Sequence, residues 1–586
     1  MGIFEVLSLL CGLALFLYGM DVMGDSLKKS AGSSLKNILA KMTSNPVKGF
    51  LLGLVVTAVI QSSSATTVMV VGFVNSGTMT LLQAVGVIMG ANVGTAVTAW
   101  LTGLSGIESA EGALEIVKWL KPDSWMPVLA VIGICMIMFS KRGKKKDVGA
   151  ILLGFAVLMV GMSMMSDSVS GLKESESFKS ILTMFENPIL GVIAGLILTA
   201  IVQSSSASVG ILQSLTVTGA ISFGAAIPII MGQNIGTCVT AMLSSIGANK
   251  NGKRAAIVHL YFNIIGVVVL LSLFYIVNAI FGFAFVSTPI DMWGVAGVHT
   301  IFKILSVLLM APFYKQLAKL SVLTVRDKKG DDDEAVNLLD ERLMNTPAFA
   351  VQRATEVTAT MAQISTSALL KSLDICEKYD AKLADEIREL ENKADILEDA
   401  LGTYLVKVSA LSVDENDSRQ ITKLLHIIGD FERISDHAVN ILESAEEIKE
   451  KKIEFSKEAQ RELSVLRSAT REILNAANDA YVKGDLARAA DVEPIEQVVD
   501  DLRDRIKLNH ILRLQKSECT IELGFVLSDL LTNFERVSDH CSNIAGCIIE
   551  ISAYAALDMH KYLSDIKHGS EGFEEKYKEY KRKYSI

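Results

Sequence analysis

Apolar and polar positions divide the chain into a first part of long uncharged runs and a second part with an amphipathic helical pattern. About 20 consecutive apolar residues cross the hydrocarbon core of a bilayer as a helix. Runs of this kind predict seven crossings, at residues 3–20, 78–102, 126–140, 148–165, 220–245, 255–285 and 292–312. Two further apolar runs, at 49–75 and 191–216, are interrupted by polar clusters. We expect each of these to enter and leave the membrane on one side, as a re-entrant hairpin.

The charge distribution separates the same two parts. Residues 1–330 contain 23 Lys and Arg against 14 Asp and Glu, whereas residues 331–586 contain 33 against 51. Basic residues gather in short loops of the first part, and such loops remain on the cytoplasmic side. This predicts a multi-pass protein of the cytoplasmic membrane, with its N-terminus outside and its second part in the cytosol. The acidic balance argues against a nucleic-acid partner.

The membrane part repeats itself at an offset of 142 residues. The segment 45–67 matches the segment 187–209 at 12 of 23 positions. Residues 21–48 carry five lysines, while their counterparts at 163–190 carry four acids and two lysines. The difference in charge predicts that the two copies cross the membrane in opposite directions. Inverted repeats with interrupted apolar segments at matching positions indicate the binding site of a secondary transporter.

The interrupted segments carry the candidate binding residues. Residues 49–107 and 187–249 contain no Asp, Glu, Lys, Arg or His, yet each holds a Gln-Ser-Ser-Ser run. A lone Ser can bond back to its own helix, but four consecutive polar residues cannot share one helix face. We therefore expect a helix break that lines a wet cavity. Broken helices expose amides that favour anions and carbonyls that favour small cations, so a bound anion would be balanced by a cation such as Na⁺.

A second motif, Gly-x-Asn-x-Gly-Thr, occurs at 90–95 and again at 232–237. Its glycines could serve close helix packing, but inside a membrane span we expect the motif to unwind the helix and expose polar ligands. Asp21, Asp25 and Asp167 are interpreted as solvated caps at helix ends. The predicted substrate and sodium site consists of Gln61, Ser62, Ser63, Ser64, Thr66, Thr67, Asn92, Thr95, Gln203, Ser204, Ser205, Ser206, Ser208, Asn234 and Thr237.

Paired Gln-Ser-Ser-Ser motifs in inverted repeats resemble the type II sodium/phosphate cotransporter family, in its bacterial form with a PhoU-like tail. The resemblance covers most of residues 1–312. It implies that the two hairpins form the phosphate and sodium site, which corresponds here to Gln61–Ser64 with Thr66 and to Gln203–Ser206 with Ser208. It also implies phosphate transport with Na⁺ as the coupling ion, and it leaves uptake and efflux both open.

The second part of the chain is duplicated as well. The sequence Asp-Phe-Glu-Arg-Ile-Ser-Asp-His at 430–437 recurs as Asn-Phe-Glu-Arg-Val-Ser-Asp-His at 533–540. Acidic residues repeat at intervals of four on one helix face, where like charges repel, so a compensating cation is expected. The motif is similar to the PhoU family, whose two three-helix bundles carry metal clusters, and this implies a divalent or transition metal. His437 and His540 could be ligands or surface histidines. The predicted metal ligands are Glu391, Asp395, Asp399, Glu432, Asp436, Asn440, Glu496, Asp500, Asp504, Glu535, Asp539 and Asn543.

These interpretations combine into an all-α protein with a polytopic membrane part and a PhoU-like pair of three-helix bundles. The predicted domains are a transmembrane domain at 1–325 (repeats about 18–102 and 160–245), a charged linker at 326–344, a PhoU-like domain at 345–560 and a charged tail at 561–586. No His or acid lies near the serines to activate a nucleophile, and no P-loop is present, so an enzyme is not expected.

The predicted function is sodium-coupled transport of inorganic phosphate, regulated by the metal-binding domain. The predicted partners are phosphate, sodium and the lipid bilayer, together with a second copy of the chain or a cytosolic signalling partner. Two alternatives stay open. One is a phosphate-sensing signalling protein, and the other is a transporter or exporter of another small anion.

Overall fold

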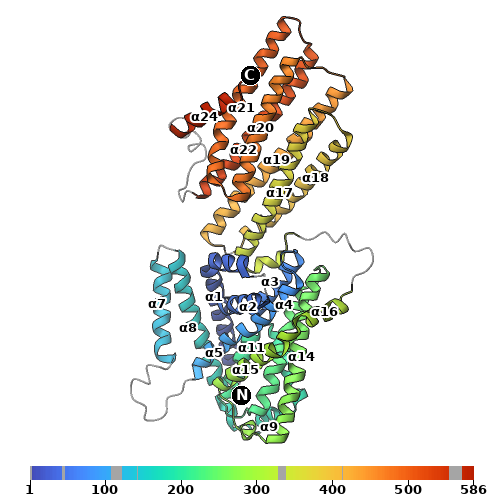
Figure 1. The fold of residues 1–586 in the computed structure, drawn as a ribbon. Helices are drawn as coiled ribbons and strands as arrows, with labels where there is room; N and C mark the ends of the chain where they lie inside the picture. The colour runs from blue at the N-terminus through green and yellow to red at the C-terminus, as the bar shows by residue number, and fades with distance from the viewer. Residues whose placement is uncertain are drawn as a thin grey trace. The chain divides into compact units, whose positions relative to one another are not determined.

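The computed structural model describes residues 3–42, 46–106, 122–140, 143–326, 338–411, 413–552 and 571–586. Every regular element in these residues is a helix (Figure 1), which confirms the all-α prediction. The chain divides into two compact units, Met1–Ala350 and Val351–Ile586. Most of the predicted linker 326–344 and the first part of the predicted tail 561–586 lie outside the described residues.

The N-terminal unit consists mainly of apolar helices, and some of them, such as α1, continue beyond their apolar runs. Among the described residues, six stretches are long and apolar enough to cross a membrane, and they coincide with six of the seven predicted crossings. The seventh, at 126–140, forms a shorter apolar helix. The helices are α1 (Ile3–Met42), α2 (Pro46–Ile60), α3 (Ser63–Asn75), α4 (Leu81–Gly94), α5 (Ala96–Gly103), α7 (Pro122–Phe139), α8 (Gly143–Ser170), α9 (Glu176–Met184), α10 (Pro188–Val202), α11 (Ser205–Thr216), α12 (Phe223–Gly236), α13 (Cys238–Ser244), α14 (Lys250–Phe281), α15 (Met292–Met310) and α16 (Tyr314–Thr324).

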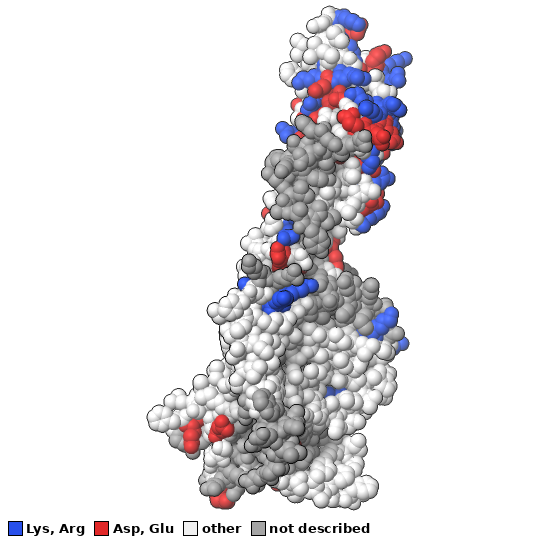
Figure 2. Space-filling view, turned by 90° about the vertical axis from the view of Figure 1, so that its left-hand side faces the viewer, with Lys and Arg blue, Asp and Glu red and all other residues white. Residues whose placement is uncertain are grey.

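The outer surface of this unit is apolar, as contact with lipid requires. On α10, Ile189, Ile193, Ile197 and Ile201 form one exposed stripe at intervals of four residues. Figure 2 shows few charged groups among the described residues of the N-terminal unit on the face drawn, and many on the C-terminal unit. The amphipathic and uncharged patterns of the sequence therefore correspond to two different surfaces.

Equivalent helices of the two repeats, α1 and α8, pack directly against each other. A Cβ added to Gly12 would lie 2.9 Å from the carbonyl oxygen of Gly161, and one added to Gly19 would lie 2.6 Å from that of Gly154. Gly154 and Gly161 are the counterparts of Gly12 and Gly19 at the offset of 142. Gly12 therefore contacts the counterpart of Gly19, and Gly19 contacts the counterpart of Gly12. This reciprocal contact defines a two-fold axis between α1 and α8. Because the paired residue numbers rise in α1 as they fall in α8, the helices are antiparallel and the repeats are inverted.

Glycine also allows close packing within each repeat, where α2 lies on α4 and α10 lies on α12. A Cβ added to Gly90 would lie 1.9 Å from a carbonyl oxygen of α2, and one added to Gly232 would lie 2.0 Å from a carbonyl oxygen of α10. Gly53 and Gly195 on the opposing helices are equally constrained, each at 2.0 Å from a facing carbonyl oxygen. Small residues at such positions let membrane helices approach closely. The glycines of the Gly-x-Asn-x-Gly-Thr motif therefore serve packing.

The helix break expected in that motif is confined to its last residue. α4 remains helical through Gly94 and α12 through Gly236, and new helices begin after Thr95 and Thr237. The expectation that the motif as a whole unwinds is therefore wrong. The two threonines stand at the one-residue breaks between α4 and α5 and between α12 and α13.

The described residues of the C-terminal unit form six long helices and one short one. The long helices are consecutive and amphipathic, and α18 packs on α19 as α21 packs on α22. The short helix α24 lies on α21, where its Lys581 pairs with Asp501 at 2.7 Å. The predicted charged tail is thus partly a docked helix. The bounds are α17 (Pro347–Ile375), α18 (Ala381–Ser409), α19 (Glu415–Glu450), α20 (Lys457–Lys483), α21 (Leu486–Gln515), α22 (Ile521–Ser552) and α24 (Glu571–Lys583).

Candidate functional site

The two Gln-Ser-Ser-Ser runs form tight turns between short helices. Gln61 and Gln203 adopt left-handed conformations with φ of 59° and 56°, which interrupts the chain between α2 and α3 and between α10 and α11. Ser62 and Ser204 then cap the next helices, since their hydroxyls accept from the amides of Ala65 and Ala207 at 3.2 Å. The predicted helix breaks are present at equivalent positions of both repeats.

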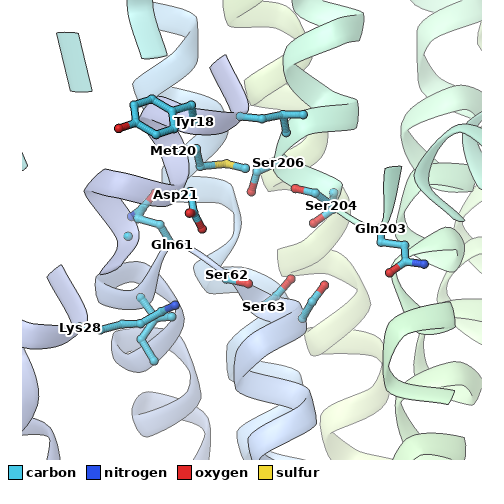
Figure 3. Close-up of a pocket in the computed structure, with 15 residues that line it drawn as sticks. Tyr18, Met20, Asp21, Lys28, Gln61, Ser62, Ser63, Gln203, Ser204 and Ser206 are labelled. Carbon is cyan, nitrogen blue, oxygen red and sulfur yellow. The ribbon is translucent and has the colours of Figure 1, made fainter. Parts of the chain in front are cut away.

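Both turns line one pocket of about 440 Å³ (Figure 3). The pocket therefore joins polar segments that lie 142 residues apart in the sequence. Helix α1 forms its remaining wall. The lining residues are Leu17, Tyr18, Met20, Asp21, Gly24, Lys28, Ile60, Gln61, Ser62, Ser63, Ser64, Gln203, Ser204, Ser205 and Ser206.

The pocket is well suited to an oxyanion. The first residues of α3, Ser63 and Ser64, and of α11, Ser205 and Ser206, belong to the turn whose amides have no acceptor within the helix. Two helix N-termini thus present partial positive charge to the same space. The serine hydroxyls add donors that can rotate toward a ligand. No catalytic nucleophile and base are needed for such a site.

Helix α1 brings charged groups that the sequence interpretation missed. Asp21 was expected to be a solvated cap at a helix end, but it lies in the middle of α1 and projects toward the space between the two turns (Figure 3). Lys28 lines the same pocket and forms an ion pair of 2.9 Å with Asp25. The pocket is therefore not free of basic side chains. The sequence could have indicated this position only through a helix that continues past the apolar run 3–20, which places Asp21 inside the helix.

Other predicted site residues lie behind the turns instead of in the pocket lining. Thr66 accepts a hydrogen bond of 3.0 Å from Thr57, and Thr67 donates to the carbonyl of Ser63 at 2.9 Å. Ser208 occupies the position equivalent to Thr66 in the second repeat and is fully buried. Thr66 and Thr67 thus stabilise the first turn of α3, which faces the pocket.

The Asn and Thr of the Gly-x-Asn-x-Gly-Thr motifs also lie outside the lining. Asn92 and Asn234 donate to carbonyl oxygens one turn earlier in their own helices, at 3.1 and 2.7 Å. Thr237 donates to the carbonyl of Gln233 at 2.9 Å. Thr95 donates to the carbonyl of Asn92 at 3.0 Å and also accepts a hydrogen bond of 3.2 Å from Lys303. These four residues thus lie at the helix breaks or within one turn of them, and not in the pocket lining.

A line of threonines on α5 connects the first serine turn to other helices. Thr98 donates to Gln61 at 2.9 Å, and Thr102 donates to Gln213 of α11 at 2.6 Å. Just before them, Thr95 holds Lys303, which is 3% exposed and has no acidic partner among the described residues. A charged residue inside the predicted crossing 292–312 was visible in the sequence, and its position beside the motif was not.

The second repeat lacks this connection. Gln203 is exposed and its side chain points away from the serines (Figure 3), whereas Gln61 is 6% exposed. Thr240, the counterpart of Thr98, donates to the carbonyl of Thr237 in its own helix at 2.9 Å. The two turns are therefore equivalent in backbone but different in how their glutamines are held.

Replacing Thr98 by Val is expected to weaken binding of an oxyanion in this pocket by about fivefold, because one neutral hydrogen bond that positions Gln61 contributes about 1 kcal/mol. The readout is the dissociation constant of the purified protein for inorganic phosphate, the oxyanion that the sequence resemblance implies. Thr240→Val is the matched control, since Thr240 holds no glutamine, and it should leave the dissociation constant unchanged. Equal effects of both substitutions would contradict the role given to Thr98.

The predicted metal ligands lie on facing helices of the C-terminal unit. They are carried by α18 and α19 in the first bundle and by α21 and α22 in the second. Within the described ranges, no three His, Cys, Asp or Glu side chains converge closely enough to form a ready-made metal site. Burial raises the pKa of Glu432 to about 7, and the charge of Asp436 adds to the shift. Carboxylates that repel each other in this way suit a divalent cation.

The two histidines connect α19 and α22 reciprocally. His437 Nδ1 lies 2.8 Å from Asn533 Oδ1, and His540 Nδ1 lies 2.9 Å from Asp430 Oδ1. Asn543, predicted as a ligand, also donates to Asp430 at 3.1 Å. Asp430 and Asn533 are counterparts at the offset of 103. The contact between α19 and α22 is therefore reciprocal, as the contact between α1 and α8 is in the membrane unit. The described contacts of both histidines are thus with the opposite helix.

The fold and the pocket define the class of protein. Inverted repeats, broken helices at matching positions and one polar pocket between them are the architecture of a membrane transporter. Residues 15–167 and 157–294 match the Na⁺/Pi-cotransporter family, and residues 358–445 and 463–548 match the PhoU domain. The chain belongs to the Na⁺/Pi-cotransporter family, in a form that carries PhoU domains. This family consists of transporters and is not a class of enzymes.

Similar proteins share either the whole chain or one of its parts. YjbB of Escherichia coli (strain K12), a protein named for inorganic phosphate export, is 24% identical over 552 residues, 93% of this chain and 97% of YjbB. The human sodium-dependent phosphate transport protein 2B is 38% identical over 165 residues, 25% of this chain and 24% of that protein. A PhoU homologue of Thermotoga maritima, named as an accessory protein of phosphate-specific transport, is 29% identical over 154 residues, 26% of this chain and 65% of that protein. No solved structure matches the chain.

Proposed function

We propose that this protein transports inorganic phosphate across the cytoplasmic membrane together with sodium ions. The observation that carries the proposal is the single pocket lined by Ser62–Ser64 of one repeat and Ser204–Ser206 of its inverted copy. A site shared by two inverted repeats can open to either side of the membrane when the repeats exchange conformations. The names of the similar proteins support phosphate as the substrate.

Buried oxygen atoms behind the second turn support a cation as the co-substrate. Thr199 Oγ1, Ser208 Oγ, Gln233 Oε1 and Asn234 Oδ1 have no hydrogen-bond partner among the described residues. They belong to α10, α11 and α12, and Gln233 Nε2 donates to the carbonyl of Ser208 at 2.9 Å. Buried polar atoms without partners are costly, and oxygen is the ligand that hard cations take. A sodium ion here would also offset the charge of bound phosphate.

Replacing sodium by choline is expected to lower phosphate flux by about tenfold or more, because the anion then enters without its balancing charge. The measurement is radiolabelled phosphate movement in proteoliposomes under an imposed sodium gradient, applied in either direction. Flux that follows the sign of the gradient supports the proposal. Flux that is the same in choline would remove sodium from it and leave phosphate transport in place.

We further propose that the C-terminal unit lies in the cytosol, binds a divalent or transition metal and regulates transport. The PhoU matches support a regulatory role, since the Thermotoga maritima relative is named as an accessory protein of phosphate transport. The same matches favour a second candidate function, in which the membrane unit senses phosphate and the PhoU domains act on a signalling partner. Phosphate flux by the purified protein in vesicles, without any other protein, distinguishes transport from sensing alone.

A further inference from the structure

The two bundles of the C-terminal unit bring equivalent positions together with different charges. The offset of 105 residues that relates Glu391, Asp395 and Asp399 to Glu496, Asp500 and Asp504 also makes Glu398 and Arg503 counterparts. Glu432 and Glu535 are counterparts at 103. In the first bundle Glu398 and Glu432 line the same pocket, of about 470 Å³. In the second bundle the guanidinium of Arg503 forms an ion pair with Glu535. Equivalent positions therefore carry two acids in the first bundle and a base with an acid in the second.

The first bundle leaves its acids largely uncompensated. The basic side chain beside them is Arg433, at 3.6 Å from Glu432 and 3.5 Å from Asp436. Arg433 is 62% exposed, so water screens its charge. A cation from solution would therefore be stabilised here by carboxylates of both α18 and α19.

The second bundle carries its own cation. Arg503 is 25% exposed and, besides Glu535, lies 3.0 Å from Asp504 and 3.9 Å from Asp500. One guanidinium thus contacts three of the carboxylates and binds them through a rigid fork of donors. A divalent ion at this place would be repelled by Arg503 and would compete with it for the same oxygens.

We propose that the C-terminal unit takes a metal ion in its first bundle alone, and that Arg503 replaces the metal in the second. This deepens the metal-binding part of the proposed function. The duplicated domain is then chemically asymmetric, with one bundle whose charge depends on the metal supply and one whose charge does not. A divalent cation such as Mn²⁺ or Mg²⁺ suits the oxygen donors of the first bundle.

The test is equilibrium binding of Mn²⁺ to the purified full-length chain, read as metal per protein. Glu432→Gln is expected to weaken Mn²⁺ binding by about tenfold or more, while Glu535→Gln leaves it unchanged. Arg503→Glu restores the acid found at the equivalent position 398 and should roughly double the bound Mn²⁺. Arg503→Gln serves the same purpose with a smaller change, should the charge reversal fail to fold.

The Mn²⁺ content of these variants distinguishes binding in the first bundle alone from binding in both bundles. Equal losses from Glu432→Gln and Glu535→Gln would show that both bundles bind metal and would overturn the inference. An unchanged Mn²⁺ content in Arg503→Glu and Arg503→Gln would also overturn it. If the unmodified chain binds no Mn²⁺, the metal-binding part of the proposed function fails together with the inference. Phosphate flux is not part of this assay, so proposed transport is judged separately.

Discussion

Replacing Ser62, Ser63 and Ser64 together by alanine is expected to lower phosphate flux by about 10² or more. Hydrogen bonds to a charged ligand contribute about 1.5–3 kcal/mol each, and two or three hydroxyls of this turn face the pocket. Removal of Ser62 also deletes the cap of α3, at about 1 kcal/mol. The measurement is the initial rate of labelled phosphate movement in proteoliposomes with equal amounts of incorporated protein.

The inverted repeat provides the matched experiment. Alanine at Ser204, Ser205 and Ser206 should reduce flux to a similar extent, because both turns line the same pocket. Ser214→Ala is the control, since its hydroxyl donates to the carbonyl of Ile211 at 2.8 Å within α11, away from the pocket. Loss of flux from one triplet alone would show that the substrate is held by a single repeat.

Replacing Gly90 by valine is expected to destabilise the membrane unit by about 3 kcal/mol or more, since overpacking against backbone cannot be relieved by a rotamer change. A Cβ at this position would lie 1.9 Å from the carbonyl oxygen of Phe50. The helices α2 and α4 would have to separate, which displaces the first serine turn. The readout is the melting temperature of the purified protein in detergent and its elution as a single species.

Gly297→Val is the control for this substitution. Gly297 lies in the membrane helix α15, and a Cβ added there meets no atom within 4 Å. Its melting temperature should change little, whereas Gly232→Val in the second repeat should behave like Gly90→Val. If Gly90→Val folds and melts like the unmodified chain, the close approach of α2 and α4 is incorrect.

The architecture was predictable because its signals are local and repeated. The offset of 142 residues, the two serine runs and the absence of charge over 49–107 and 187–249 required no knowledge of packing. Together they predicted inverted repeats with two broken hairpins, and the structure confirms this fold. The reciprocal glycine contact of α1 and α8 adds the two-fold axis that the charges had only implied.

The wall of the pocket was not predictable in the same way. The apolar run of α1 ends near residue 20, so Asp21 and Lys28 looked like solvated residues at a membrane boundary. The helix continues to Met42, and its polar turns face the serines. Which helix covers a pocket is a property of tertiary packing, and no period in the sequence of α1 records it.

The predicted metal ligands show a similar limit of prediction from the sequence. The sequence presented the predicted ligands of α18, α19, α21 and α22 as four equivalent sets, because spacing reports only which residues share a helix face. Arg503 lies among the predicted ligands of α21, but its ion pair with Glu535 depends on how α21 packs on α22. The prediction that all twelve residues bind metal stays untested, and the contacts of Arg503 argue against it for the second bundle.

A structure determined with sodium and phosphate bound would decide whether the two serine turns act as one site. We expect phosphate to lie between Ser62–Ser64 and Ser204–Ser206, in contact with the N-termini of both α3 and α11. Phosphate held elsewhere in the membrane unit, with both serine turns remote from it, would contradict the proposed site.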